Sequence, residues 1–212
     1  MEYEIIKWHM PKRINNPLTA IKPEGIILHY VGNPGTSAWA NANYFHHVDK
    51  AVSANYVVDD DHIYEIIPPD RKSYGTSNSY YNTHFVQIEM CHKDNTGYIS
   101  EATLKNVVWL CKKLIAQYGC DKVIRHYDVT GKICPKWYVE HPEDWDKLKR
   151  RILTKEAVTM DNIPSEWAKD AVDWATDNDI IKGDAFGDLR LRDAVTREEL
   201  LVILFRALSI HP

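Results

Sequence analysis

The chain has 212 residues, of which 44% are apolar and 26% are charged, a composition typical of globular proteins. Its formal net charge of −4 argues against nucleic acid as a partner. No apolar run approaches the roughly 20 residues that a membrane-spanning helix needs, so we expect no insertion into a membrane.

The N-terminal residues and the cysteines indicate where the protein is made. Residues 1–7 lack the basic segment and the following apolar segment of a secretion signal, so we expect synthesis in the cytoplasm without a signal peptide. In that compartment a disulfide framework is not expected. Cys91 and Cys111 lie in apolar strand and helix patterns, which indicates small buried side chains, and Cys120 lies in a turn. Only Cys134 has neighbours that suggest chemistry.

Strand-like and helix-like patterns alternate over roughly the first 150 residues. Short apolar segments predict strands at residues 26–29, 55–58, 63–67, 86–91 and 123–126. Helices are predicted at residues 37–48 and 100–118 and after Pro142. The polar residues 59–62 suit a hairpin turn. The pattern predicts an α/β fold, with a mixed central β-sheet flanked by helices.

The helix predicted at residues 100–118 has the clearest pattern. Its apolar residues recur at the spacing of one helix face. Ser100 is a suitable N-cap, and Gly119 is the residue expected to end the helix.

The charge balance changes near residue 153. Residues 1–153 contain 19 Lys and Arg against 18 Asp and Glu, whereas residues 154–212 contain 7 against 12. We therefore predict a first domain at residues 1–153, a linker at residues 154–159 and a small all-α domain at residues 160–212.

The second domain is predicted to be a helix–loop–helix unit. Residues 165–178 and 196–208 carry apolar stripes at helical spacing, and a loop with two glycines lies between them at residues 180–188. Thr196 and Glu199 have the spacing of a capping box. A unit of about 55 residues forms only a marginal core, so we expect it to pack on the first domain or to self-associate.

Three residues far apart in the chain form a candidate metal site. His29 and His126 each end an apolar strand pattern, and Cys134 follows in the segment GKICP. Two imidazoles and one thiolate would leave the fourth position of a tetrahedral zinc ion open, as in catalytic zinc sites. The sequence alone does not show that the three residues meet, and a histidine at a strand end is more often an ordinary polar residue.

Glu89 and Lys132 are the candidate catalytic residues at this site. Glu89 interrupts an apolar strand, where a carboxylate is either paired or functional. As a base it would take the proton of a water molecule activated by zinc. Lys132 precedes Cys134 by two residues and would stabilise the oxyanion. The alternatives are that Glu89 pairs with a core Lys or Arg, and that Lys132 is a solvated loop residue.

The first domain resembles the N-acetylmuramoyl-L-alanine amidases of the phage-lysozyme and peptidoglycan-recognition-protein superfamily. Four segments carry the resemblance: ILHY at 27–30, VSANYVV at 52–58, IEMC at 88–91 and RHYDVTGKICP at 125–135. The resemblance covers about residues 5–153. It implies that His29, His126 and Cys134 bind zinc and that Glu89 and Lys132 assist catalysis.

The chain departs from the family pattern in one strand. Family members commonly have His where this chain has Asn55, and some branches use a Tyr whose place here falls on Ala54, with Tyr56 pointing elsewhere. These departures favour Glu89 as the base. From the same motifs, Tyr30 and Asn55 are taken as candidate substrate-binding residues.

The tail resembles a single S-layer homology unit. The segments WAKDAV at 167–172, WA at 174–175, IIKGD at 180–184 and VTREEL at 195–200 carry this resemblance. Such units bind secondary polymers of Gram-positive cell walls, usually as three copies, and Trp167 and Arg197 are the candidate wall-binding residues. One copy implies weak anchoring or a homo-oligomer. The alternative is a small helical packing module.

The two resemblances together imply an endolysin. It would be a zinc-dependent amidase that hydrolyses the amide between N-acetylmuramic acid and L-alanine of peptidoglycan, anchored to the wall by its C-terminal unit. The alternatives are an inactive peptidoglycan-recognition protein and a zinc peptidase that cuts within the stem peptide.

The absence of a signal peptide favours a phage or prophage enzyme released by a holin, with a sporulation or mother-cell autolysin as the other source. An internal start at Met160 would yield the second domain alone.

Overall fold

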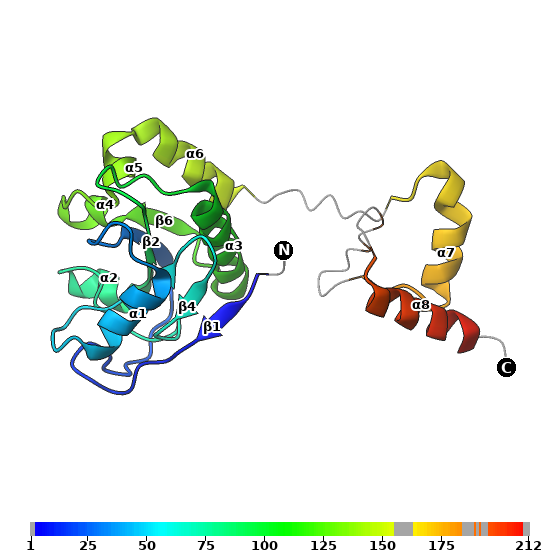
Figure 1. Cartoon of the computed structure of the whole chain (residues 1–212), viewed down its shortest axis with the longest axis horizontal. Coiled ribbons are helices and arrows are strands. Elements are labelled where there is room, and N and C mark those ends of the chain that lie inside the picture. Colours follow the sequence, from blue (N-terminus) through cyan, green and yellow to red (C-terminus); the bar gives the residue numbers. More distant parts are fainter. Residues whose placement is uncertain (1–2, 155–162, 184–188, 190, 192–194, 210–212) are drawn as a thin grey trace. The chain divides into compact units, whose positions relative to one another are not determined.

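The computed structural model of the chain describes residues 3–154, 163–183, 189, 191 and 195–209. The chain forms two compact units, residues 1–154 and residues 155–212 (Figure 1). Most of the predicted linker, residues 155–159, and the proposed internal start at Met160 lie outside the described residues.

The first unit is built on a sheet of six strands in its described part, in the order β1-β4-β3-β5-β2-β6. The strands are β1 (Ile5–Lys7), β2 (Gly25–Tyr30), β3 (Tyr56–Val58), β4 (Ile63–Glu65), β5 (Phe85–Met90) and β6 (Lys122–Arg125). The hairpin pair β3 and β4 is antiparallel, and the other pairs are parallel. The predicted mixed sheet with a hairpin at residues 59–62 is therefore confirmed.

Six helices accompany the sheet in the described part of this unit: α1 (Ala38–His47), α2 (Ser79–His84), α3 (Glu101–Tyr118), α4 (His126–Thr130), α5 (Lys136–Glu140) and α6 (Pro142–Leu153). The predictions of α1, α3 and α6 are confirmed. The predicted strand end at His126 is wrong, because β6 ends at Arg125 and His126 is the first residue of α4.

Strand alternation divides the apolar side chains between the two faces of the sheet. One cluster joins Leu28 and Ile88 to Leu110 of α3 and Leu148 of α6. The other joins alternate residues, such as Val57, to the side chains of α1. Figure 1 shows α3 and α1 on different sides of the strands. His29, Gln87 and Glu89 are odd-numbered like Val57 and therefore lie on the face opposite α3.

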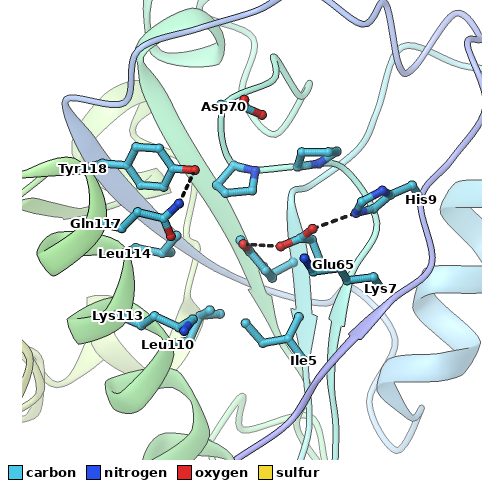
Figure 2. Close-up of a pocket in the computed structure, with 13 residues that line it drawn as sticks. Ile5, Lys7, His9, Glu65, Asp70, Leu110, Lys113, Leu114, Gln117 and Tyr118 are labelled. Atoms are coloured by element: carbon cyan, nitrogen blue, oxygen red, sulfur yellow. Dashed lines mark hydrogen bonds and ion pairs between the residues drawn. The ribbon is translucent and has the colours of Figure 1, made fainter. Parts of the chain in front are cut away.

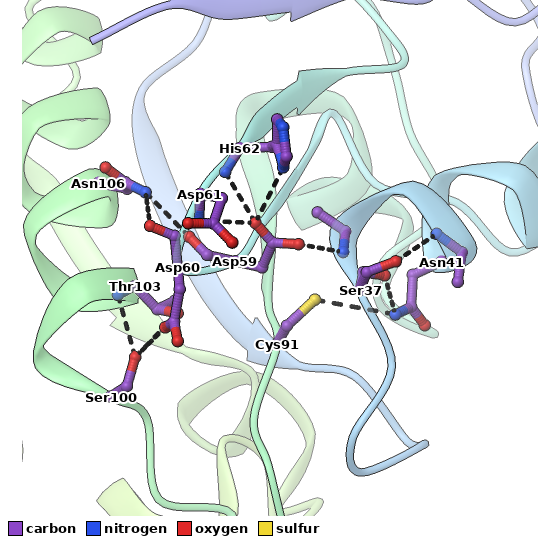
Figure 3. A network of polar contacts seen from close by, with 12 residues as sticks. Ser37, Asn41, Asp59, Asp60, Asp61, His62, Cys91, Ser100, Thr103 and Asn106 are labelled. Atoms are coloured by element: carbon purple, nitrogen blue, oxygen red, sulfur yellow. Dashed lines mark hydrogen bonds and ion pairs between the residues drawn. The ribbon is translucent and has the colours of Figure 1, made fainter. Parts of the chain in front are cut away.

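The hairpin turn after β3 fixes the starts of two helices (Figure 3). A carboxylate oxygen of Asp59 accepts a hydrogen bond of 2.7 Å from the backbone N–H of Ala38, at the start of α1. The Asp60 carboxylate accepts hydrogen bonds from the hydroxyls of Ser100 and Thr103, at the start of α3. The N–H of Thr103 in turn donates to the Ser100 hydroxyl, as predicted for an N-cap.

A half-enclosed cleft of about 280 Å³ lies on the α3 face of the sheet (Figure 2). The buried Glu65 lines it, and the Tyr56 hydroxyl donates to Glu65 Oε2 over 2.7 Å. His9 Nε2 lies 2.6 Å from the other carboxylate oxygen. Tyr56 thus points away from His29, as the sequence comparison with the family predicts.

The second unit contains a 3₁₀ turn (Glu166–Ala168) and the helices α7 (Lys169–Asp177) and α8 (Arg197–Ser209). The predicted capping box is confirmed: the N–H of Thr196 donates to Glu199 Oε2 and the N–H of Glu199 donates to the Thr196 hydroxyl. Trp167 is 90% exposed, and no residue of α7 or α8 is buried. Residues 184–188 of the predicted loop lie outside the described residues.

Among the helices described in either unit, none has the length and hydropathy to cross a membrane.

Replacing Gly119 with Ala should lower the free energy of unfolding by about 1 kcal/mol, because Gly119 ends α3 with a φ of 69°, where a Cβ is disfavoured. Gly32→Ala is the matched control: a Cβ at either position meets no atom within 4 Å, but Gly32 is not left-handed. Urea unfolding of the full chain, followed by circular dichroism, measures both. Equal losses in the two variants would contradict this account of the helix end.

Candidate metal centre

His29, His126 and Cys134 converge at the end of the sheet. Nδ1 of His29 lies 3.1 Å from Nδ1 of His126 and 3.9 Å from Sγ of Cys134. The candidate ligand atoms of all three residues lie within 4.8 Å of one another, and all three residues are buried. The structure thus brings together the three residues that the sequence could only suggest as a set.

Parallel pairing brings the two histidines together. The register pairs Leu28 of β2 with Arg125, the last residue of β6, so His29 of β2 and His126, which follows β6, lie at the same end of the sheet. The short helix α4 runs from His126 to Thr130, and Gly131 caps its end with a φ of 75°.

A tight turn then returns the chain to the histidines. The N–H of Tyr127 donates to the carbonyl of Cys134 over 2.9 Å, which closes the turn that contains α4. Arg125 holds the base of this turn, because its guanidinium bonds the Asp128 carboxylate and the carbonyl of Tyr138. The cysteine therefore lies beside the two imidazoles.

The electrostatics of the three residues suit a cation. Burial, followed by the neighbouring His126, lowers the pKa of His29 to about 3, and burial, followed by Lys132, lowers that of His126 to about 4. Both rings are therefore neutral and can donate lone pairs at pH 7. Burial, followed by the charge of Glu89, raises the pKa of the Cys134 thiol to about 12. A bound zinc ion would deprotonate the thiol, and two imidazoles with one thiolate are ligands that zinc prefers. The donor set fits zinc.

Glu89 lies beside this group, on the strand that pairs with the strand of His29. In the sheet its backbone pairs with that of His29, so the two side chains are neighbours on one face. Its Oε2 atom is buried and has no hydrogen-bond partner among the described residues. Burial raises the pKa of Glu89 to about 8, against the opposing charge of Lys132. A buried carboxylate oxygen without a donor is costly, and a cation held by the three ligands would offset that cost.

Lys132 is exposed, but its charge reaches the site. It lowers the pKa values of His29, His126 and Glu89. In the described part of the chain, no ion pair joins Glu89 to a core Lys or Arg. The alternative role of Glu89, as partner of a core cation, therefore lacks support.

The two candidate substrate-binding residues of the first unit differ in position. Tyr30 is half-buried, its backbone contacts the Cys134 thiol, and its ring stacks on His92. Asn55 is fully buried, and its amide donates to the carbonyls of Pro68 and Arg71. The prediction of Asn55 as a substrate-binding residue is wrong, because its side chain is saturated by the protein and out of reach of a ligand.

Sequence reasoning missed Gln87. Its Oε1 atom lies 2.7 Å from Nε2 of His29, and the residue is fully buried. The available signal was its place two residues before Glu89, which puts both polar side chains on one face of an apolar strand.

Comparison with known protein families identifies the family of this chain. The sequence profile of the N-acetylmuramoyl-L-alanine amidase family matches residues 19–137, more than half of the chain. The chain belongs to this amidase family. The matched region contains His29, His126 and Cys134. The profile of the S-layer homology domain matches residues 159–201, so both resemblances noted in the sequence are confirmed.

Two curated amidases illustrate the relationship. The N-acetylmuramoyl-L-alanine amidase CwlL of Bacillus licheniformis is 33% identical over 146 residues, which cover 61% of this chain and 40% of the relative. A probable N-acetylmuramoyl-L-alanine amidase of the same species is 36% identical over 152 residues, which cover 64% and 42%. The chain thus spans about two fifths of the length of these relatives.

Two solved structures share the fold of the first unit. The catalytic domain of XlyA is 29% identical, with a TM-score of 0.62 over 70% of this chain and 99% of that domain. PlyL has a TM-score of 0.65 over 73% of this chain and 99% of its own, at 22% identity, and so supports the fold alone. The mixed sheet flanked by helices is therefore a fold that this chain shares with both proteins.

Cys134→Ala should weaken zinc binding by more than roughly 100-fold, since losing a ligand costs more than losing a ligand's hydrogen-bond partner. Cys120→Ala is the control, because Cys120 is also buried and lies outside the three-residue group. Zinc dissociation constants from competition with a coloured chelator measure the effect. Undiminished affinity in Cys134→Ala, or an equal loss in both variants, would contradict the assignment.

Proposed function

We propose that the first unit is a zinc-dependent hydrolase that cleaves the amide between N-acetylmuramic acid and L-alanine in peptidoglycan. One observation carries the proposal: His29, His126 and Cys134 converge beside the unpartnered buried oxygen of Glu89 in a chain of the amidase family. The matched relatives are named for this activity. The catalytic domain would comprise residues 1–153, followed by a linker at residues 154–159.

The three ligands would hold the ion through Nδ1 of His29, Nδ1 of His126 and Sγ of Cys134, the atoms that face one another. When bound, zinc supplies a Lewis acid that activates water and polarises the scissile carbonyl. Two imidazoles and a thiol favour zinc over cations such as Mg²⁺ and Ca²⁺, which prefer oxygen ligands.

Glu89 moves the proton in this reaction. Its carboxylate takes a proton from the attacking water and delivers it to the nitrogen of the leaving L-alanine. Water and the amide thereby yield a free carboxylate on the muramic acid and a free amino group on the stem peptide. Burial raises the pKa of Glu89, and a cation beside the carboxylate would lower that pKa again, so the group could accept a proton and release it near neutral pH. Lys132 contributes positive charge toward the carbonyl oxygen as negative charge develops there.

The second unit would anchor the enzyme to a secondary polymer of the cell wall. Its match to the S-layer homology domain supports this role, as do the exposed side chains of Trp167 and Arg197. A single weak site gains avidity only when several copies engage together, so we include homo-oligomerisation through this unit. Light scattering that gives only a monomer mass would exclude that part.

The protein would act on the bacterial wall as an endolysin. We propose synthesis in the cytoplasm of a phage-infected or lysogenic cell, followed by release through a holin. Peptidoglycan is the partner, and neither nucleic acid nor membrane insertion has a part in this function.

Glu89→Gln should reduce hydrolysis of purified peptidoglycan by about 10²–10⁴-fold while zinc content stays unchanged, because the amide keeps the shape of the side chain but cannot take the proton. Glu143→Gln, an exposed change at the start of α6, is the control. Labelling of new amino termini identifies the product.

The products separate the alternatives. New N-terminal L-alanine released from muramic acid is the expected result. New termini elsewhere in the stem peptide would indicate a peptidase. Bound zinc with no product from the wild type on any wall would indicate a recognition protein, and full activity in Glu89→Gln would remove Glu89 from the reaction.

Trp167→Ala and Arg197→Ala should each reduce co-sedimentation of the full chain with purified walls several-fold, because each removes an exposed contact of the second unit. Both are made in the inactive Glu89→Gln background so that the walls stay intact. Arg150→Ala removes an exposed cation from α6 of the first unit and should leave sedimentation unchanged. Equal sedimentation of all variants would reject the assigned residues.

A further inference from the structure

Gln87 is a buried polar residue that the proposed reaction does not use. It lies on β5, two residues before Glu89, and its side chain projects from the face that carries His29. The residue is fully buried. Its Oε1 atom lies 2.7 Å from Nε2 of His29, the ring nitrogen that faces away from His126 and Cys134.

The surroundings of Gln87 fix which way its amide points. Its Nε2 atom donates to the carbonyl oxygens of Tyr81 and Phe85, over 3.2 and 3.4 Å. A carbonyl oxygen only accepts, so the NH₂ group must occupy this end of the amide. The Oε1 atom therefore faces His29.

This orientation decides which nitrogen of His29 carries the hydrogen. Because Oε1 of Gln87 only accepts, Nε2 of His29 must donate. A neutral imidazole with its hydrogen on Nε2 has its lone pair on Nδ1, the atom that faces His126 and Cys134. Hydrogens on both nitrogens would make a charged ring, which burial disfavours at this site.

We propose that Gln87 is a positioning residue that presets His29 in the metal-binding tautomer and orientation. This inference rests on the proposed zinc function. Metal-binding histidines are held by a hydrogen bond from the other ring nitrogen, and loss of that bond weakens metal binding by roughly 10–100-fold. Gln87 supplies this bond through a neutral amide.

Gly75 contributes to the position of the Gln87 amide. A Cβ at Gly75 would lie 2.6 Å from Oε1 and 2.9 Å from Cδ of Gln87, closer than real contacts allow. The missing side chain at Gly75 thus leaves the space that the Gln87 amide occupies. Asn55 holds the strand itself, because its Oδ1 accepts from the N–H of Gln87 and its own N–H donates to the carbonyl of Gln87. The role of the buried Asn55 is therefore to support Gln87.

The tautomer can be read in the wild-type full chain without any substitution. Metal-free protein with ¹⁵N-labelled histidine should show, at neutral pH, a hydrogen-bearing Nε2 and a lone-pair Nδ1 for His29. His29→Gln, which lacks the ring, assigns the signals. A hydrogen on Nδ1, or an equal mixture of the two forms, would overturn the proposal.

Zinc affinity provides the second test. Gln87→Leu removes the acceptor and should weaken zinc binding by roughly 10–100-fold. Gln87→Glu keeps the acceptor toward His29, and in its protonated form it also keeps a donor toward the carbonyls of Tyr81 and Phe85, so it should restore most of the affinity and the Nε2 hydrogen. Gln117→Leu makes the same change at an exposed position near the end of α3. This control variant should bind zinc with the affinity of the wild type. Wild-type affinity in Gln87→Leu would contradict the proposal.

Gly75→Ala tests the position of the Gln87 amide without changing Gln87 itself. The new Cβ should displace the amide and weaken zinc binding, and it should add no further loss in the Gly75→Ala/Gln87→Leu double variant, because its effect passes through the amide. Additive losses would show that Gly75 acts by another route and would overturn its assigned part. If Gln87→Leu does not fold, the Gly75→Ala affinity and the wild-type tautomer still decide.

The outcomes separate this inference from the function beneath it. No zinc binding by the wild type would reject the proposed function, whatever the tautomer. Tight zinc binding by the wild type together with a mixed tautomer, or with an indifferent Gln87→Leu variant, would reject only the role of Gln87.

Discussion

The parallel pairing of β2 with β5 on one side and β6 on the other is the constraint on which the site depends. Parallel strands end at the same edge, so the end of β2 delivers His29, the end of β6 delivers His126, and the β5 register sets Glu89 beside His29. A slip of one residue in β2 would turn His29 to the α3 face and replace it by an apolar neighbour. The turn through α4 then needs only to return Cys134 to a point that the sheet has already defined.

The site gathers polar groups where burial is expensive. Burial keeps the imidazoles neutral and the Cys134 thiol protonated, and it raises the pKa of the Glu89 carboxyl to about 8. These shifts all disfavour charge, and a cation at the centre reverses the penalty for the thiolate and for the carboxylate. Within this arrangement Gln87 has a different part, since its neutral amide orients one ligand without adding charge. The burial that disfavours charge on these side chains would therefore favour a metal ion bound among them.

The sequence predicted the elements whose patterns are long or have clear end signals. Helix α3 has 18 residues, a Ser100 cap and a Gly119 terminus, and all three features were readable. The strand β1 and the helices α2, α4 and α5 have only three to six residues, which is too short for a helical or strand period to show. His126 was misplaced for the same reason, because a one-turn helix directly after a strand has no signature of its own. The candidate ligands were chosen from motifs, but the point where they meet depends on contacts between residues 97 and 105 positions apart in the sequence, which no local pattern encodes. Asn55 was misjudged because a motif position does not reveal burial.

Zinc-edge X-ray absorption on the zinc-loaded full chain tests the central claim most directly, because it counts the ligands of the metal by element. The account predicts a four-coordinate zinc with two nitrogen ligands at about 2.0–2.1 Å, one sulfur ligand at about 2.3 Å and one light-atom ligand from solvent. A site with no sulfur ligand, or with a coordination shell filled entirely by protein sulfur and nitrogen, would contradict it.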